Sequence, residues 1–321
     1  MIRRPPRSTH CISSAASDVY KRQESPPVSL KLLWVILLVF YSSIVSAQTV
    51  TDETGKTLDI PDYAQRILPL SPSLAEILFS LGLDERIVGV TEFATYPPAT
   101  SGKPKVGTFF NPSLEKILAL EPDLVIVGSE RQDAKTSAAL KKFKIPVYRV
   151  RPVDLKTIYV SICNLGAITG VEGRALQVVA EMKTEVARIE IRVAGLKPQR
   201  VFYQVGVDPI VTANRKTFAA DLIRRAGGVL VTADNPVRYP VYAIEKIIVD
   251  APEVIIISSM SPDTNYDRFR LSWQRWTTIP AVRNKRIYVI ESDMVDRPSP
   301  RIVDGLALMA GFIHPEAFTE N

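Results

Sequence analysis

The chain has 321 residues, 46% hydrophobic and 23% charged, with 24 Pro, 15 Gly and two Cys. That length allows one large or two ordinary domains. The composition excludes disordered and collagen-like chains. The two thiols, Cys11 and Cys163, are too few for a disulfide framework, a zinc ribbon or an iron–sulfur site. The net charge of +6 arises mainly before Gln48, and the residues from Gln48 onward carry only +2, which argues against a nucleic-acid partner because such binding needs excess Lys and Arg.

The N-terminal residues are predicted to be absent from the mature protein. Residues 32–45 form an apolar run of 14 residues that follows Lys31 and leads into small residues ending at Ala47. These lengths are typical of a secretory signal peptide over 24–47, whereas an uncleaved anchor, the alternative, needs about 20 apolar residues. Residues 1–23 lack periodicity and look like adaptor read-through, with a genuine long leader as the alternative. We therefore expect a periplasmic protein.

The exported part alternates helical and strand signals, as an α/β protein does. Capped amphipathic segments predict helices, and short runs of branched apolar residues predict buried strands. In chain order, we expect a helix at 71–82, a strand at 87–90, a helix at 111–120, a strand at 124–127, a helix at 133–144, a strand at 146–150, helices at 154–169 and 171–196, a strand at 200–205, a helix at 217–226, a Gly-Gly turn at 227–228, a helix at 242–250, a strand at 253–258, a helix at 264–276, a strand at 286–290 and a helix at 300–313.

An internal repeat predicts two similar lobes. Residues 113–127 match residues 243–257 at a constant offset of 130, although shared strand–helix punctuation could produce part of the match. We therefore expect an N-terminal α/β lobe over 48–170 and a C-terminal α/β lobe over 197–321, bridged by one long rigid helix over 171–196. Two such lobes leave a cleft, where small ligands usually bind.

Several segments of the exported chain follow a pattern known from one protein family. They are, in order, residues 67–79, 88–91, 96–98, 105–109, 111–115, 121–125, 240–245 and 299–302. In this order they resemble the periplasmic metal-chelate binding proteins of ABC importers, which serve cobalamin, ferric siderophores and haem. The resemblance implies a monomer without resident cofactor or metal, which delivers its chelate to a membrane permease and the ATPase complex of that permease.

Within that family, the cobalamin-binding branch is the most similar. Its ligand-lining segments correspond to residues 202–206, 238–240 and 292–301. The sequence departs from the branch because Phe109, Tyr239 and Met294 stand where the branch carries Trp. The resemblance thus implies a cobalamin-like corrinoid as the ligand, with a ferric siderophore or haem as the alternative.

Aromatic side chains are the main candidates for ligand contact, because a flat macrocycle binds to large, stiff apolar faces and phenol hydroxyls reach its peripheral amides. Ordinary core packing is the alternative for each, but the Pro-rich loops 93–98 and 235–242 favour a cleft position. Asp293 and Arg297 could bond to ligand amides or to a phosphate, or could simply form a surface pair. The candidates are Phe93, Tyr96, Phe109, Tyr203, Tyr239, Tyr242, Asp293, Met294 and Arg297.

The alternative ligands would use other groups. Haem would need a Tyr phenolate on its iron, from Tyr96 or Tyr239, and an anionic siderophore would need an arginine cluster, with Arg238 and Arg297 as candidates.

Glu115 and Glu245 occupy equivalent places in the repeat. Each stands in a predicted first helical turn, where the helix dipole alone explains a carboxylate. The resemblance implies instead that they meet arginines of the permease, one from each lobe. The sequence contains no G-x-S-x-G, Walker or H-E-x-x-H motif, so we expect no enzyme, and an exported α/β hydrolase is the remote alternative.

Overall fold

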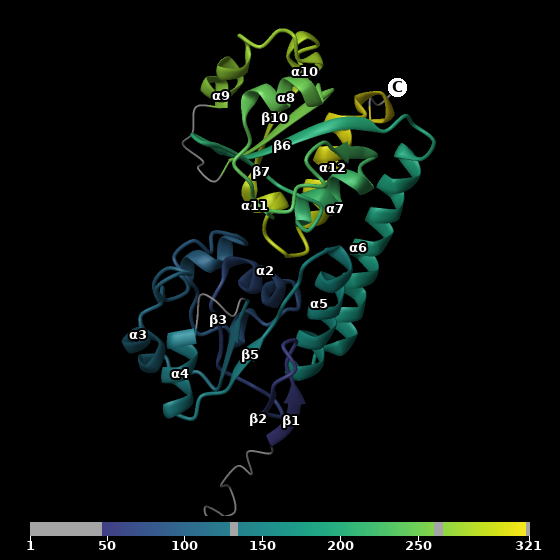
Figure 1. The fold of residues 1–321 in the computed structure, drawn as a ribbon. Helices are drawn as coiled ribbons and strands as arrows, with labels where there is room; N and C mark the ends of the chain where they lie inside the picture. The colour runs from purple at the N-terminus through teal and green to yellow at the C-terminus, as the bar shows by residue number, and fades with distance from the viewer. Residues whose placement is uncertain (1–46, 129–133, 260–265, 319–321) are drawn as a thin grey trace, which may run out of the picture. The chain divides into compact units, whose positions relative to one another are not determined.

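The computed structural model describes residues 47–128, 134–259 and 266–318. The predicted leader, and the predicted signal peptide as far as residue 46, lie outside these ranges. Within them, no helix has the length and apolar character needed to cross a membrane. The α/β class predicted from the sequence is confirmed, because helices flank two sheets that contain parallel strand pairs (Figure 1).

The N-terminal sheet has three parallel strands in the order β3–β4–β5. The middle strand is buried along its whole length, as expected for a parallel strand covered on both faces. A two-stranded antiparallel hairpin of β1 and β2 precedes this sheet. The elements are β1 (Ala47–Thr51), β2 (Thr57–Pro61), β3 (Ile67–Pro69), α2 (Pro72–Ser80), α3 (Leu114–Ala119), β4 (Leu124–Val127), α4 (Ala134–Lys142), β5 (Val147–Arg149) and α5 (Leu155–Thr169), with short 3-10 helices at Asp84–Arg86 and Pro98–Gly102.

The C-terminal sheet has five strands in the order β10–β9–β6–β7, with β8 also paired to β6. Strand β7 runs antiparallel to β6, and the other pairs are parallel. The elements are β6 (Gln199–Val207), β7 (Ile210–Thr212), α7 (Phe218–Arg225), β8 (Gly228–Leu230), α8 (Ile244–Asp250), β9 (Val254–Ser259), α9 (Tyr266–Trp273), α10 (Pro280–Arg283), β10 (Ile287–Glu291), α11 (Ser292–Val295) and α12 (Ile302–Ile313), followed by a 3-10 helix at Pro315–Ala317.

The helix α6 (Glu172–Val193) lies between the two sheets in the sequence. Its 22 residues span about 33 Å at 1.5 Å per residue. It packs against α5 and α12 through a stripe of buried side chains at helical spacing. The stripe comprises Ala175, Val178, Val179, Met182, Val186, Ile189 and Val193. The predicted helix over 171–196 is therefore present, and it ends where Ala194 takes an extended conformation.

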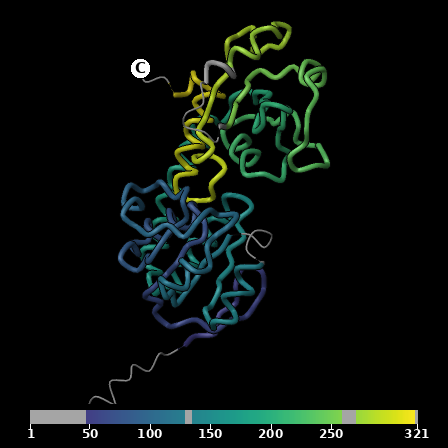
Figure 2. The backbone as a smooth tube through the Cα atoms, turned by 90° about the vertical axis from the view of Figure 1, so that its left-hand side faces the viewer, coloured from purple at the N-terminus to yellow at the C-terminus, as the bar shows by residue number. Residues whose placement is uncertain are grey.

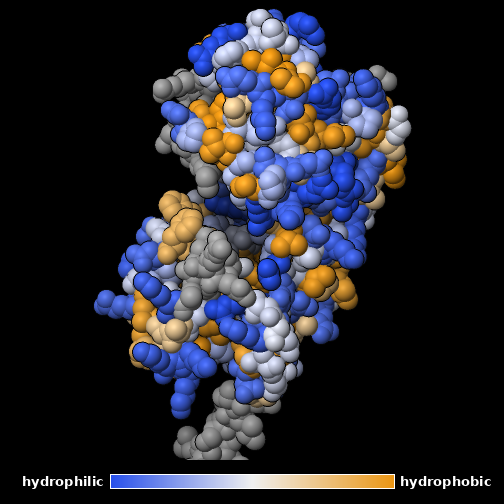
Figure 3. All heavy atoms as spheres, viewed as in Figure 1, coloured by the Kyte–Doolittle hydropathy of each residue, from blue (hydrophilic) through white to orange (hydrophobic). Residues whose placement is uncertain are grey.

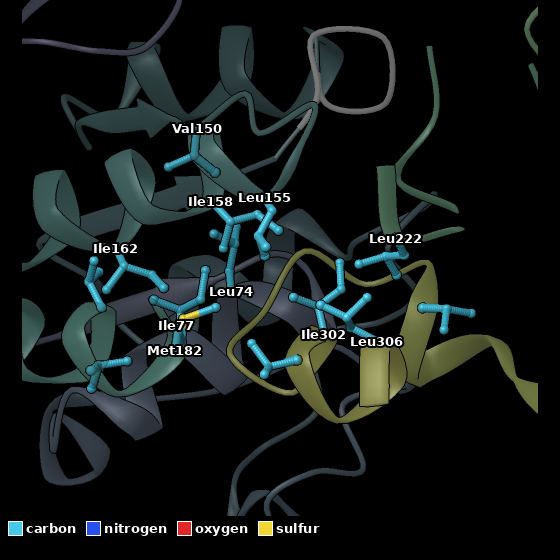
Figure 4. Packing of buried hydrophobic residues seen from close by; sticks show 14 of the residues in the cluster. Leu74, Ile77, Val150, Leu155, Ile158, Ile162, Met182, Leu222, Ile302 and Leu306 are labelled. Carbon is cyan, nitrogen blue, oxygen red and sulfur yellow. The ribbon is translucent and has the colours of Figure 1, made fainter. Parts of the chain in front are cut away.

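One cluster of buried side chains is shared by elements from both ends of the chain (Figure 4). Leu74 and Ile77 of α2 belong to it, together with Met182 of α6 and Leu306 of α12. Two smaller clusters lie elsewhere, one with Phe202 of β6 and one among residues of β3 and β4. Figure 2 shows α11 and α12, in yellow, beside N-terminal segments, and hydrogen bonds from residues 299 and 301 to Glu76 of α2 agree with that placement.

Several details of the predicted elements are wrong. Residues 87–90 are extended but form no strand, because Val88 bonds to β3 while Val90 bonds to residues 104–106, so no continuous ladder develops. The helix predicted over 111–120 begins only at Leu114, because the hydroxyl of Ser113 caps it. Gly228 begins β8 rather than completing a turn. The first part of the helix predicted at 264–276 lies outside the described residues.

Candidate functional site

The loop that carries Phe93 and Tyr96 is held by hydrogen bonds to residues 105 and 107. The backbone N–H of Glu92 donates to the carbonyl of Gly107 at 2.9 Å, and the Lys105 ammonium donates to the carbonyls of Ala94 and Thr100 at 3.1 Å each. Burial lowers the pKa of Lys105, which matches an ammonium held beneath the loop. The aromatic side chains above it remain in contact with water: Phe93 is 57% exposed and Tyr96 43%.

A second aromatic pair follows in the loop before α3. The rings of Phe109 and Phe110 meet edge to face, with centroids 5.2 Å apart. Phe109 is half-buried, whereas Phe110, which the sequence analysis did not single out, is exposed. Gly107 turns the chain at a φ of 104°, and a Cβ there would come within 2.9 Å of the Asn111 carbonyl oxygen. Two consecutive Phe residues in a Pro-containing loop were the sequence feature that could have identified Phe110 as a candidate.

Tyr239 and Tyr242 lie in the loop before α8 but differ in their surroundings. Tyr239 is half-exposed, with the Arg238 guanidinium 5.6 Å from its ring centroid, and burial is the main reason that the pKa of Tyr239 is raised. Tyr242 is more enclosed: its hydroxyl donates to Asp250 at 2.6 Å, and burial together with that carboxylate raises the pKa of Tyr242 to about 12. Its ring packs on Phe202 of the core. Tyr239 is thus the more accessible of the two.

Two hollows lie next to this loop. One hollow, of about 690 Å³, is lined by four cationic residues, two acids and several apolar residues; the charged ones are Asp154, Arg215, Lys216, Asp221, Arg224 and Arg238. Both acids are already engaged, Asp154 as the cap of α5 and Asp221 with Arg224 and Arg225. The other hollow, of about 330 Å³, has a mixed lining in which the aromatic residues are Tyr242, Trp273 and Trp276. Figure 3 shows hydrophobic residues dispersed among hydrophilic ones over one face of the molecule.

Asp293, Met294 and Arg297 lie on and just after α11. Arg297 donates to Asp293 at 2.7 Å and reaches the backbone carbonyl of Phe93 at 3.3 Å, so this pair is not merely a local surface contact. Burial, only partly offset by Arg297 and Arg301, raises the pKa of Asp293. Met294 is half-buried and packs against the main core cluster. The structure therefore brings Arg297, just after α11, next to Phe93, which lies 204 positions away in the sequence.

A buried carboxylate underlies this contact and was not anticipated from the sequence. Glu76 of α2, whose side chain is 2% exposed, accepts two hydrogen bonds from Arg301, at 2.9 and 2.7 Å, and one from the Ser299 hydroxyl at 2.7 Å. The Arg301 guanidinium in turn lies 4.0 Å from the centroid of the Tyr96 ring. A Glu on the apolar face of the predicted helix 71–82 was the available signal, because an acid there needs a partner.

Tyr203 has no exposed surface, and its hydroxyl donates to Asp296 at 3.2 Å. The Ser258 hydroxyl donates to the same carboxylate at 2.8 Å. Burial raises the pKa of Tyr203 well above its ordinary value, and enclosure of the carboxylate by protein atoms raises the pKa of Asp296, although the residue still reaches solvent. The Tyr203 ring therefore offers no free face, and Asp296 is the accessible end of this polar group.

The two glutamates of the repeat occupy matching positions. Residues 113–127 fold as α3 and β4, and residues 243–257 fold as α8 and β9, so each copy is a helix followed by a parallel strand. Glu115 and Glu245 are exposed in the first turns of α3 and α8, and neither carboxylate has an ion pair or a hydrogen bond among the described residues. The described residues also contain no group of three or more His, Cys, Asp or Glu side chains arranged to hold a metal ion.

Comparison with known proteins places this arrangement in a family. Residues 67–294 match the family model described as periplasmic binding protein. An uncharacterized ABC transporter substrate-binding lipoprotein of Bacillus subtilis is 30% identical over 281 residues, which cover 85% of this chain and 87% of that protein.

Two solved structures share the fold. The periplasmic vitamin B12 binding protein BtuF of Vibrio cholerae is 26% identical with a TM-score of 0.69, and the match covers 80% of this chain and 99% of that one. The periplasmic heme-binding protein RhuT from Roseiflexus sp. RS-1, in its apo form, is 25% identical with a TM-score of 0.70, covering 79% and 99%. Proteins named for corrin and for haem binding are thus about equally similar to this chain.

Proposed function

This chain belongs to the periplasmic binding protein family, a family of binding proteins rather than enzymes, and we propose that it captures a cobalamin-like corrinoid for an ABC importer. Membership of this family implies that the protein acts outside the cytoplasm and that a permease is its partner. The proposal adds the periplasm as the compartment, cleavage of the signal peptide after Ala47 and a monomeric state.

The observation that carries the ligand proposal is the set of water-exposed aromatic side chains on loops next to the strands. Phe93 and Tyr96 come from the N-terminal part and Tyr239 from the C-terminal part, and each is about half-exposed. Large aromatic side chains that keep about half of their surface in water are candidates for a surface that another molecule covers. A flat macrocycle with peripheral amides fits such a surface, because rings cover its faces while Asp293 and Arg297 reach its edge.

The proposed binding mode places the ligand in a cleft between two lobes, at 48–170 and 197–321, which the helix over 171–196 bridges rigidly. Residues Phe109, Tyr203, Tyr242 and Met294 complete the proposed lining, although Tyr203 could contribute only through Asp296. On the outer side, we propose that Glu115 and Glu245 dock with arginines of the permease. The absence of any intramolecular partner for these two carboxylates, within the described part of the chain, supports docking over a purely structural role.

One observation favours a second ligand, haem or a ferric siderophore. The half-exposed phenols of Tyr96 and Tyr239 could ligate iron, and the hollow beside Arg238 has more cationic than acidic residues in its lining, which would suit carboxylate groups. Both alternatives keep the same transport role.

The test is a binding titration of the purified protein, lacking residues 1–47, with three probes: cyanocobalamin, haemin and a ferric hydroxamate chelate. We expect stoichiometric binding of cyanocobalamin, seen as a change in its visible spectrum and as heat in calorimetry. Tight binding of haemin or of the ferric chelate alone would replace the corrinoid with the alternative ligand. If none of the three binds, the metal-chelate proposal is wrong.

A further inference from the structure

Glu76 is the most buried charged side chain near the proposed ligand site, and it belongs to a charge-balanced group of four. Glu76 and Asp293 supply the negative charges, and Arg297 and Arg301 supply the positive ones. Arg301 bonds to Glu76 through two nitrogens, while the Nη1 atom of Arg297 lies 3.5 Å from the same carboxylate. Such a buried group is stable only while all its members are present, because one uncompensated charge is costly.

Both arginines make a second contact with a residue proposed to face the ligand. The Arg301 guanidinium, held flat by its two bonds to Glu76, lies 4.0 Å from the centroid of the Tyr96 ring. Arg297 donates to the carbonyl of Phe93 at 3.3 Å and to Asp293 at 2.7 Å. Guanidinium groups stack on aromatic faces and donate in a fixed planar fork, so fixing their orientation also fixes their neighbours.

From this geometry we propose that Glu76 is the positioning residue of the ligand site: it touches no ligand, but through Arg301 and Arg297 it sets the orientation of the Tyr96 and Asp293 side chains and the position of the Phe93 backbone. That these residues face a ligand rests on the proposed function, whereas the positioning by Glu76 rests on the observed contacts alone. Glu76 also joins α2 to the segment 299–301, which carries the chain from α11 into α12. The Glu76 carboxylate therefore fixes the loop of Phe93 and Tyr96 relative to residues 293–301.

A Glu76→Gln variant keeps the shape of the side chain and removes its charge. Arg301 then faces a neutral amide, and we expect it to turn toward solvent and leave the ring of Tyr96. The matched control is Glu53→Gln, because the Glu53 carboxylate also accepts bonds from three donors, the Arg151 amide and the side chains of Ser161 and Asn164, but contacts none of the proposed ligand residues. Both variants should lose thermal stability.

The first measurement needs no ligand. With a fluorinated tyrosine placed at position 96, fluorine NMR of the free protein should show one resonance displaced from that of the free amino acid. Glu76→Gln should move this resonance toward the solvent value, whereas Glu53→Gln should leave it in place. An unchanged resonance in Glu76→Gln would overturn the proposal whatever the protein binds.

The second measurement is the affinity for cyanocobalamin. Glu76→Gln should weaken binding at least about tenfold, while Glu53→Gln, at a comparable loss of Tm, should bind as the wild type does. Equal affinity in both variants would reduce Glu76 to a structural residue. If Glu76→Gln fails to fold, Arg301→Lys replaces it, since lysine keeps the charge but cannot make two parallel bonds or stack flat, and the same two changes are expected. A wild-type protein that binds no chelate contradicts the proposed function, and the fluorine measurement then still decides the role of Glu76.

Discussion

Replacing Tyr239 by Ala should weaken ligand binding and also cost the fold a similar, slightly smaller amount of free energy. The side chain is 48% exposed in the free protein. A fully buried Tyr removes roughly 200 Å² from water, so a ligand that covers the exposed part removes about 100 Å². At about 25 cal/mol per Å² this contact contributes about 2.5 kcal/mol, and its loss lowers affinity by up to about 70-fold. The buried part of the ring limits the loss in the free energy of unfolding to about 2 kcal/mol.

Isothermal titration with cyanocobalamin and thermal unfolding measure the two effects side by side. Tyr239→Phe separates the ring from the hydroxyl and should retain most of the affinity. Tyr63→Ala is the control, because Tyr63 is 66% exposed and lies against Gly170, away from the proposed site. An unchanged affinity in Tyr239→Ala together with a clear drop in Tm would mean that Tyr239 is a core residue, and the proposed ligand surface would be wrong.

The remaining predictions concern docking, pH and motion. The double replacement of Glu115 and Glu245 by Ala should leave chelate binding intact but abolish most uptake in a transport assay; normal uptake would leave only the helix-dipole explanation. Enclosure by protein raises the pKa of Asp296 above its ordinary 3.8, so the folded protein keeps this proton to a higher pH than the unfolded chain and loses stability as pH rises through that interval. Asp296→Asn should therefore gain Tm relative to wild type at pH 7 and lose that advantage below about pH 4, and a difference independent of pH would contradict the assignment. Because α6 has no Pro and no Gly after position 173, solution scattering with and without chelate should nearly superimpose, whereas a large change in the radius of gyration would indicate a hinge.

Helices with strong local signals could be predicted from the sequence, and so could the apolar strands β4, β5, β6, β9 and β10, whereas β3, β7 and β8 could not. The side chains of Ser71, Ser113 and Asp154 each accept a hydrogen bond from a backbone N–H at the start of their helices, and of these caps the sequence analysis anticipated Ser71. Strands β3, β7 and β8 have only three residues each, too few for an alternating pattern to stand out. Their existence depends on pairing with β4 or β6, which is decided by residues far away in the chain.

The residues of the candidate site also differ in how far the sequence could identify them. Phe93, Tyr96 and Tyr239 could be proposed from loop composition alone, and the structure leaves all three exposed. The pairing of Glu76 with Arg301 spans 225 positions, so no local pattern could reveal it. Tyr203 shows the converse case, since a Tyr inside the sequence F-Y-Q-V-G looks equally suited to a strand core or to a ligand, and the sheet buries it.

The shared core of α2, α5, α6, α7 and α12 has a consequence for how the chain folds. Each sheet leaves part of its apolar surface to be covered by helices that pack with those of the other end of the chain, as Leu74, Met182 and Leu306 do. Neither sheet with its own helices would then be a self-sufficient folding unit, because cutting the chain within α6 would expose that surface to water. We therefore expect cooperative unfolding to extend across both sheets, and a nascent chain released before α12 is made would lack the segment that completes this core.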